Sequence, residues 1–115
     1  MPVIEYEGLK FELDDEDYLV NFENWNEKVA CTLAEREGVS KECPLTNERM
    51  DILKFMRDFY KKNNAFPILS IVCKNVHQPK NCITEQFMEP LKAWKIAGLP
   101  KPAGIMAYLL SGFSK

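Results

Sequence analysis

The spacing of apolar residues predicts a short β-hairpin at the start of the chain. Apolar and polar residues alternate over residues 3–6 and 10–13, and Glu7 and Gly8 separate the two runs. A period of two, interrupted by a glycine that can adopt a positive φ, is typical of a hairpin. Because an isolated two-stranded hairpin is only marginally stable, we expect this one to pack on helices.

The spacing changes to that of a helix from Asn24 onwards. Asn24 is the expected N-cap of a first helix. Trp25, Val29 and Leu33 recur every four residues, which places them on one predicted buried face. Gly38 suits the end of this helix, because a glycine accepts the left-handed conformation that often follows a last turn.

Two further helices are predicted on either side of a break at residues 63–66. Thr46 is the expected cap of the first, whose broad apolar stripe is typical of a surface that faces a core. Pro67 suits the first turn of the second. On that second helix the apolar stripe comprises Leu69, Val72, Cys73 and Val76, and the polar stripe comprises Ser70, Lys74 and His77.

The last third of the chain is predicted to end in an irregular surface arm. Short helices are expected around residues 84–88 and 90–96. Two prolines and two glycines in residues 98–104 exclude a regular helix or strand there. The apolar block 105–110 is expected to bury its side chains on the core, on a partner or in an oligomer interface. These patterns predict a mostly α (α+β) fold, a helical bundle with an N-terminal hairpin and a C-terminal arm.

Length and composition favour one domain over residues 1–115, with the arm and its apolar extension over 98–115. The net charge of −2 arises by cancellation. Residues 1–53 hold five basic and fourteen acidic residues, a net −9, whereas residues 54–115 hold ten basic and three acidic residues, a net +7. The basic half indicates an acidic partner, although attraction between the two halves of one fold explains the asymmetry equally well.

The residue types give little indication of catalysis. The chain has one histidine, His77, and no glycine-rich phosphate-binding motif, so we expect neither catalysis nor a cofactor. The four cysteines, Cys31, Cys43, Cys73 and Cys82, form no C-x-x-C pair, which argues against a metal site. Since no signal sequence or membrane span is recognisable, we expect a cytoplasmic protein with reduced thiols and no membrane association.

Thiol chemistry is the one reaction type that these residues could support. A reactive cysteine needs an accessible thiolate near positive charge. Cys82 follows Lys80 on a predicted loop and is a weak candidate, although an unreactive surface thiol is the simpler interpretation. Cys31 is expected to face solvent, and Cys73 is expected to be a small buried hydrophobic residue.

The helix, break and helix between residues 46 and 76 also resemble a helix-turn-helix. In that interpretation the last helix would lie in the major groove of DNA, and basic residues of the preceding helix would contact phosphates. Because such helix pairs are also common in bundles that bind no DNA, both interpretations stay open. The candidate nucleic-acid contacts are Lys54, Arg57, Ser70, Lys74 and His77.

The most specific stretch of the chain is KIAGLPKPAG at residues 95–104. It closely resembles the ending of the DsrC/TusE family, the gamma-subunit proteins of dissimilatory sulfite reductase and their sulfur-relay relatives. The resemblance extends over the chain, through WNE at residues 25–27 and FMRDFY at residues 55–60. It implies a small cytoplasmic protein with a DsrC-like helical bundle and arm, and it implies sulfite reductase or sulfur-relay proteins as partners.

The arm departs from the family pattern at the positions that carry sulfur. The resemblance places one cysteine directly after Gly104 and a second one eleven residues upstream, where this chain has Ile105 and Trp94. Neither side chain can hold a persulfide. The chain also continues for ten residues beyond Ile105. Near the arm, Ser70 stands where many members carry an arginine, whereas Lys74 is retained.

Two functions follow from this resemblance. The first is a DsrC-like protein of sulfur metabolism without the sulfur-carrying cysteines, a non-catalytic binding or regulatory relative that docks on sulfite reductase or sulfur-relay partners, with DNA binding as a variant. The alternative is a sulfur carrier of the sulfurtransferase type that uses a relocated thiol such as Cys82. The residues expected to bind the partner are Lys74, Lys95, Pro100, Lys101, Pro102 and Gly104.

Overall fold

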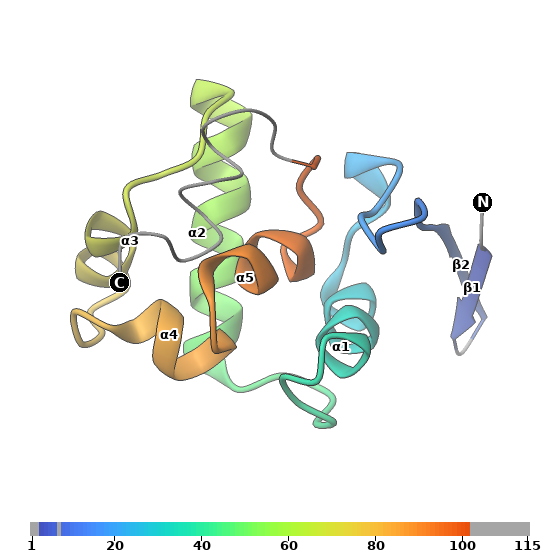
Figure 1. The fold of residues 1–115 in the computed structure, drawn as a ribbon, viewed down its shortest axis with the longest axis horizontal. Helices are drawn as coiled ribbons and strands as arrows, with labels where there is room; N and C mark the ends of the chain where they lie inside the picture. The colour runs from blue at the N-terminus through green and yellow to red at the C-terminus, as the bar shows by residue number, and fades with distance from the viewer. Residues whose placement is uncertain (1–2, 7, 102–115) are drawn as a thin grey trace.

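The predicted hairpin and helices are present in a computed structural model, which describes residues 3–6 and 8–101. Pro102, Gly104, Ile105 and the apolar block 105–110 lie outside the described residues. The fold is mostly helical with one two-stranded antiparallel sheet, as predicted (Figure 1). The elements are β1 (Val3–Tyr6), β2 (Leu9–Glu12), a 3-10 helix η1 (Phe22–Asn24), α1 (Glu27–Arg36), α2 (Asn47–Asn63), α3 (Leu69–Asn75), α4 (Cys82–Phe87) and α5 (Pro90–Ile96).

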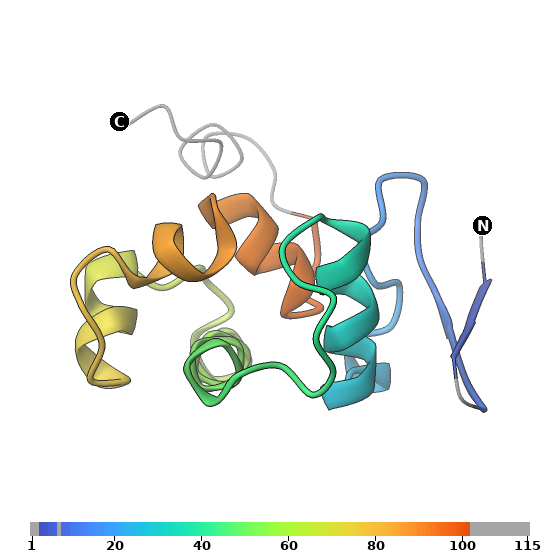
Figure 2. The same ribbon diagram turned by 90° about the horizontal axis from the view of Figure 1, so that it is seen from below.

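The N-terminal hairpin lies at the edge of the helical body (Figure 2). β1 and β2 pair in antiparallel register, with Ile4 opposite Phe11. Phe11 and Leu13 are buried and belong to the same apolar cluster as the helices. The expectation that this hairpin packs on helices is therefore confirmed.

The first helix starts later than its sequence pattern predicted. Asn26, and not Asn24, is the N-cap of α1: its side chain accepts a hydrogen bond from the Val29 backbone N–H at 2.9 Å. Trp25 lies before the helix in an extended conformation. There its indole N–H reaches the carbonyl of Ile96, a contact between distant parts of the chain that helical spacing does not reveal.

The second and third helices follow the predicted break. Thr46 caps α2 by accepting a hydrogen bond from the Arg49 backbone N–H at 3.3 Å, as expected. Pro67 was predicted in the first turn of α3, but that helix begins at Leu69 because Ile68 is still in an extended conformation. The buried positions of α3 include Val72, in agreement with the predicted apolar stripe.

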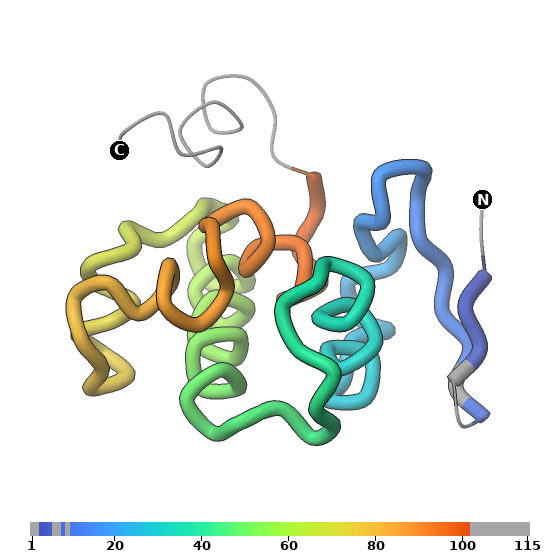
Figure 3. Tube along the Cα trace, turned by 60° about the horizontal axis from the view of Figure 1, so that its bottom comes forward, coloured from blue at the N-terminus to red at the C-terminus, as the bar shows by residue number. Residues whose placement is uncertain are grey.

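The last helix joins the other parts of the bundle. α5 contacts α1, α2 and α4. Because α1 and α2 lie far from α5 along the chain, these contacts join distant parts of the sequence. Figure 3 shows that the chain after α5 runs between the helical body and the segment that precedes α1. The root of the predicted arm is therefore enclosed by other elements.

Candidate functional site

The arm starts from a buried segment, which we call the arm root and define as residues 96–100. Ile96, Ala97 and Leu99 have no exposed surface, and Gly98 is also buried. The prediction of a surface arm beginning at residue 98 is wrong for these residues, because the Leu99 side chain belongs to the apolar core. The chain becomes exposed at Pro100.

Three side chains from three parts of the chain hold the carbonyl groups of the arm root. The Trp25 indole N–H donates to the Ile96 carbonyl at 2.9 Å, and Arg57 Nη1 donates to the Ala97 carbonyl at 2.9 Å. The Trp94 indole N–H donates to the Pro100 carbonyl. The last carbonyls of a helix have no partner within the helix, and the first of these donors satisfies that of Ile96, the last residue of α5. The other two bind carbonyls that follow the helix, and together the three donors fix the path of residues 96–100.

Gly98 lies at the closest approach between the arm root and the core. It has a positive φ of +72°, and a Cβ atom at this position would lie 2.5 Å from Cδ1 of Trp25. The same Cβ atom would lie 3.1 Å from the Arg57 Nη1 and the Leu19 side chain. The glycine is thus required both by the backbone conformation and by the lack of space.

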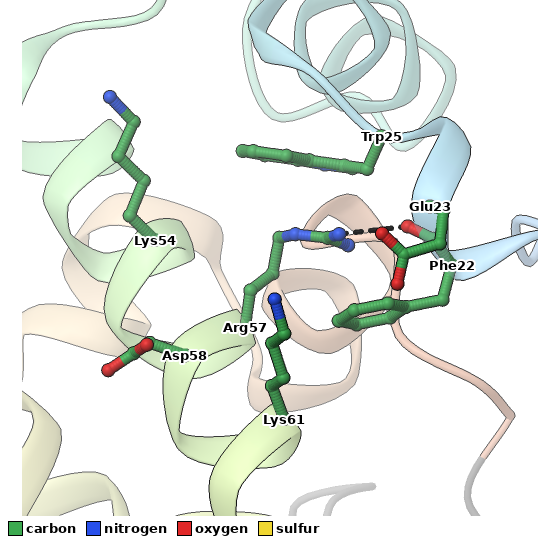
Figure 4. A pocket seen from close by; sticks show the side chains of 7 residues that line it. All are labelled: Phe22, Glu23, Trp25, Lys54, Arg57, Asp58 and Lys61. Carbon is green, nitrogen blue, oxygen red and sulfur yellow. Dashed lines mark hydrogen bonds between the residues drawn. The ribbon is translucent and has the colours of Figure 1, made fainter.

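Arg57 lies between two aromatic rings rather than on an exposed face (Figure 4). Its guanidinium carbon is 3.9 Å from the centroid of Phe22 and 4.6 Å from that of Trp25, and its Nη2 donates to the Phe22 carbonyl at 2.8 Å. Burial lowers the pKa of Arg57 to about 10. Arg57, a candidate nucleic-acid contact from the sequence, is half-buried, and its guanidinium N–H groups bind backbone carbonyls of the protein. The sequence offered one indication that Arg57 is partly buried. It lies one helical turn after Leu53 on α2, on the same side of the helix, and Leu53 is buried.

A surface pocket of about 210 Å³ adjoins this cation–π arrangement. Figure 4 shows its aromatic wall on the side of η1 and the lysines on the side of α2. Since positive and negative side chains line it together, it has no strong preference for one sign of charge. Its lining consists of Phe22, Glu23, Trp25, Lys54, Arg57, Asp58 and Lys61.

Trp94, which replaces a family cysteine by resemblance, is part of the core. It is 3% exposed and packs edge-on against Tyr60, with ring centroids 5.7 Å apart. The centroid of the Phe66 ring lies 4.3 Å from that of Trp94. This position therefore has a structural role in the described protein: it fills space behind the arm root and holds the Pro100 carbonyl.

Lys95, expected to bind a partner, faces the protein instead. It forms an ion pair with Glu37 at 3.4 Å, in which both side chains are largely buried, and its Nζ lies 4.9 Å from the Tyr18 ring centroid. Lys92 donates to the Glu37 carbonyl at 2.8 Å. These contacts join α5 to the end of α1. Burial, followed by the nearby carboxylates of Glu16, Glu37 and Asp14, raises the pKa of Tyr18 to about 12.

Replacing Tyr18 with phenylalanine is expected to reduce the loss of stability between pH 10 and pH 12. An unfolded tyrosine titrates at about 10, whereas the folded pKa is about 12. The unfolded state therefore loses its proton first, and the free energy of unfolding falls as pH rises through this window. The pKa of Arg57 is lowered in the folded state, so its titration raises the free energy of unfolding with pH, and it does so equally in the parent and in Tyr18→Phe. Urea denaturation across this window would contradict the assignment if Tyr18→Phe and the parent lost stability equally.

The other predicted partner-binding and nucleic-acid contacts are exposed and do not converge on one site. Lys101 forms an ion pair with Glu16, which raises the pKa of Lys101. The Lys54 ammonium contacts Glu27 at 2.9 Å. The remaining exposed residues are Pro100, adjacent to Lys101, and Ser70, Lys74 and His77 around α3.

The four cysteines form two disulfides, so the prediction of reduced thiols is wrong for this structure. Cys31 pairs with Cys43, and Cys73 pairs with Cys82. Cys31 was expected to face solvent but is 5% exposed. Cys82 was expected on a loop but is the first residue of α4 and has no exposed surface, whereas Cys73 is buried as predicted. Packing of neighbouring segments brings the Cα atoms within 5.5 and 5.7 Å, a separation that the spacing along the chain does not reveal.

Within residues 3–6 and 8–101, no three histidine, cysteine, aspartate or glutamate side chains lie where they could hold a metal ion. Among the helices described, none has the length and apolar character needed to cross a membrane. The arrangement at the arm root is suited to positioning a segment for binding.

Comparison with known proteins identifies relatives along nearly the whole chain. Residues 5–106 match the model of the family described as "DsrC like protein". The gamma subunit of dissimilatory-type sulfite reductase from Nitratidesulfovibrio vulgaris is 36% identical over 106 residues, which cover 90% of this chain and 98% of that protein. The sulfurtransferase TusE of Escherichia coli K12 is 35% identical over 106 residues, covering 84% and 94% respectively.

Solved structures show the same fold. The crystal structure of the oxidized gamma subunit of dissimilatory sulfite reductase (DsrC) from Archaeoglobus fulgidus matches with a TM-score of 0.74 and 33% identity. A crystal structure of dissimilatory sulfite reductase I (DsrI) contains a chain that matches with a TM-score of 0.76 and 33% identity. Both matches cover 90% of this chain and 98% of the other one.

Proposed function

The chain belongs to the DsrC-like family, and from this membership we propose that it is a cytoplasmic binding or regulatory protein of sulfur metabolism. It docks through its arm on sulfite reductase or on sulfur-relay proteins and carries no sulfur there. The observation that carries the proposal is the side chain at position 94. By resemblance this position belongs to a cysteine, whereas here it holds a tryptophan that is 3% exposed and packs against Tyr60 and Phe66.

The anchored arm root supports the docking part of the proposal. A protein that binds through a segment loses less conformational entropy if that segment leaves the core in a fixed direction. Trp25, Arg57 and Trp94 provide this by binding three carbonyls of the arm root. Beyond them Pro100 and Lys101 are exposed, and they precede the rest of the family-like sequence.

Charge reversal at Lys101 is expected to weaken binding to an acidic partner surface. The full-length protein and Lys101→Glu would be titrated by calorimetry into sulfite reductase and into sulfur-relay proteins from the same genome. A loss of about two- to tenfold in affinity is expected, the range for an exposed charge at an interface. Lys62→Glu is the matched control, since Lys62 is exposed on α2 and pairs with Asp58. Absence of binding to both kinds of partner, or equal losses in the two variants, would refute arm docking.

The alternative is a sulfur carrier of the sulfurtransferase type with a relocated thiol such as Cys82. Against it, Cys82 has no exposed surface and is bonded to Cys73. Mass spectrometry after incubation of the reduced protein with a persulfide donor separates the two functions. One additional sulfur atom, present in the parent but absent from Cys82→Ser, would favour the carrier and overturn the binding-only proposal.

DNA binding is a variant of the binding function. The exposed Ser70, Lys74 and His77 around α3 favour it, whereas Arg57 is committed to carbonyl groups inside the protein. A gel shift would support this variant if binding weakened steeply with salt and if Lys74→Ala reduced it. Binding unaffected by Lys74→Ala would exclude α3 as the contact surface.

A further inference from the structure

The two disulfides differ in their access to solvent. Cys43 is exposed, and its partner Cys31 on α1 is 5% exposed. In the second pair, Cys73 is 1% exposed and Cys82 has no exposed surface. A thiolate must approach a sulfur atom directly to exchange with a disulfide, so exposure decides which bond can react.

We propose that Cys43 is a thiol-exchange site at which a zwitterionic low-molecular-weight aminothiol opens the Cys31–Cys43 disulfide. The attacking thiolate forms a bond with Cys43 Sγ, and the Sγ–Sγ bond breaks with its electron pair passing to Cys31 Sγ. The Cys31 thiolate then takes a proton from solvent. The incoming thiol is oxidised to a mixed disulfide and Cys31 is reduced, so no further oxidant or reductant is required.

Two adjoining cavities provide room for such a ligand next to the disulfide. The smaller, of about 20 Å³, is lined by both cysteines of this pair and also by Glu35 and Lys41. The larger, of about 240 Å³, shares Glu35 and Lys41 and extends along the loop after α1. A sulfur atom can therefore enter at the disulfide while the rest of a small molecule occupies the larger cavity.

The charges around these cavities define the chemical class of the ligand. Lys41 offers an ammonium group for a carboxylate, whereas Glu35 offers a carboxylate for an ammonium group, and both line the two cavities. A second carboxylate, that of Glu42, lines the smaller cavity but forms an ion pair with Arg49 at 3.6 Å. An aminothiol that carries both charges, such as cysteine, matches this pair. A thiol without these groups, such as 2-mercaptoethanol, also attacks as a thiolate that Lys41 attracts, but it has neither a carboxylate nor an ammonium group to pair with Lys41 and Glu35.

Differential alkylation of the native protein tests the exchange site. The protein would be treated with increasing L-cysteine, the free thiols alkylated, and the peptides analysed by mass spectrometry. The expected first product has cysteine disulfide-bonded to Cys43 and an alkylated Cys31, while Cys73 and Cys82 remain paired. An adduct on Cys31, Cys73 or Cys82 instead, prior opening of the Cys73–Cys82 bond, or recovery of four free thiols before treatment would overturn the proposal.

The charge selectivity has its own control. Lys41→Ala is expected to slow exchange with L-cysteine by about two- to fivefold, the effect of one exposed ion pair. Exchange with 2-mercaptoethanol should slow less, because its thiolate is also attracted by the Lys41 ammonium group but the molecule has no carboxylate to pair with it. The difference between the two thiols separates a ligand contact from a general effect on the attacking thiolate. Equal effects of Lys41→Ala on both thiols would reject the zwitterionic ligand class.

Discussion

Replacing Gly98 with alanine is expected to lower the free energy of unfolding by about 2–5 kcal/mol, the sum of two effects. The positive φ of +72° costs a residue with a Cβ atom about 1–2 kcal/mol. Overpacking adds about 1–3 kcal/mol, since the new Cβ would lie 2.5 Å from Cδ1 of Trp25, which cannot move without losing its bond to the Ile96 carbonyl. Urea denaturation measures this loss.

Gly38→Ala is the matched control for this prediction. Gly38 also has a positive φ, +75°, but no atom lies within 4 Å of the position of its missing Cβ. It should lose only the backbone contribution of about 1–2 kcal/mol. Equal destabilisation of the two alanine variants would contradict the close contact that we describe between Gly98 and the core.

Replacing Trp94 with alanine is expected to cost about 3–5 kcal/mol, the range for a large aromatic residue removed from a core. The cavity would remove the ring contacts with Tyr60 and Phe66 and the hydrogen bond to the Pro100 carbonyl. Trp94→Phe keeps most of the volume and removes the hydrogen bond to the Pro100 carbonyl, so its cost should be about 0.5–1.5 kcal/mol.

The two Trp94 variants also separate stability from docking. Both lose the donor that holds the Pro100 carbonyl, and both should therefore weaken partner binding at temperatures where they are folded. Thermal and urea denaturation give the stability, and calorimetry with the partner gives the affinity. Parent-like affinity of Trp94→Phe would show that this hydrogen bond does not position the arm. Near-parent stability of Trp94→Ala would contradict the burial of the indole.

Much of the fold was predictable because its signals are local. The Thr46 cap and the apolar stripe of α3 depend on residues within one or two helical turns, and both are present as predicted. The KIAGLPKPAG stretch indicated the family in advance. The residues that hold the arm root were harder to predict. Trp25 was assigned to a helix face and Arg57 to a nucleic-acid contact, whereas each donates to a carbonyl far away along the chain.

By itself the sequence determined the hairpin and the order of the α-helices, the family, and the absence of cysteine from positions 94 and 105. Hydrophobic periodicity and capping residues specify these elements through contacts within a few residues. Only the tertiary structure decided that Leu99 is buried, that Arg57 binds the Ala97 carbonyl and that the cysteines lie in bonded pairs. These features depend on distances between segments that come together only when the core packs, and no local pattern encodes such distances.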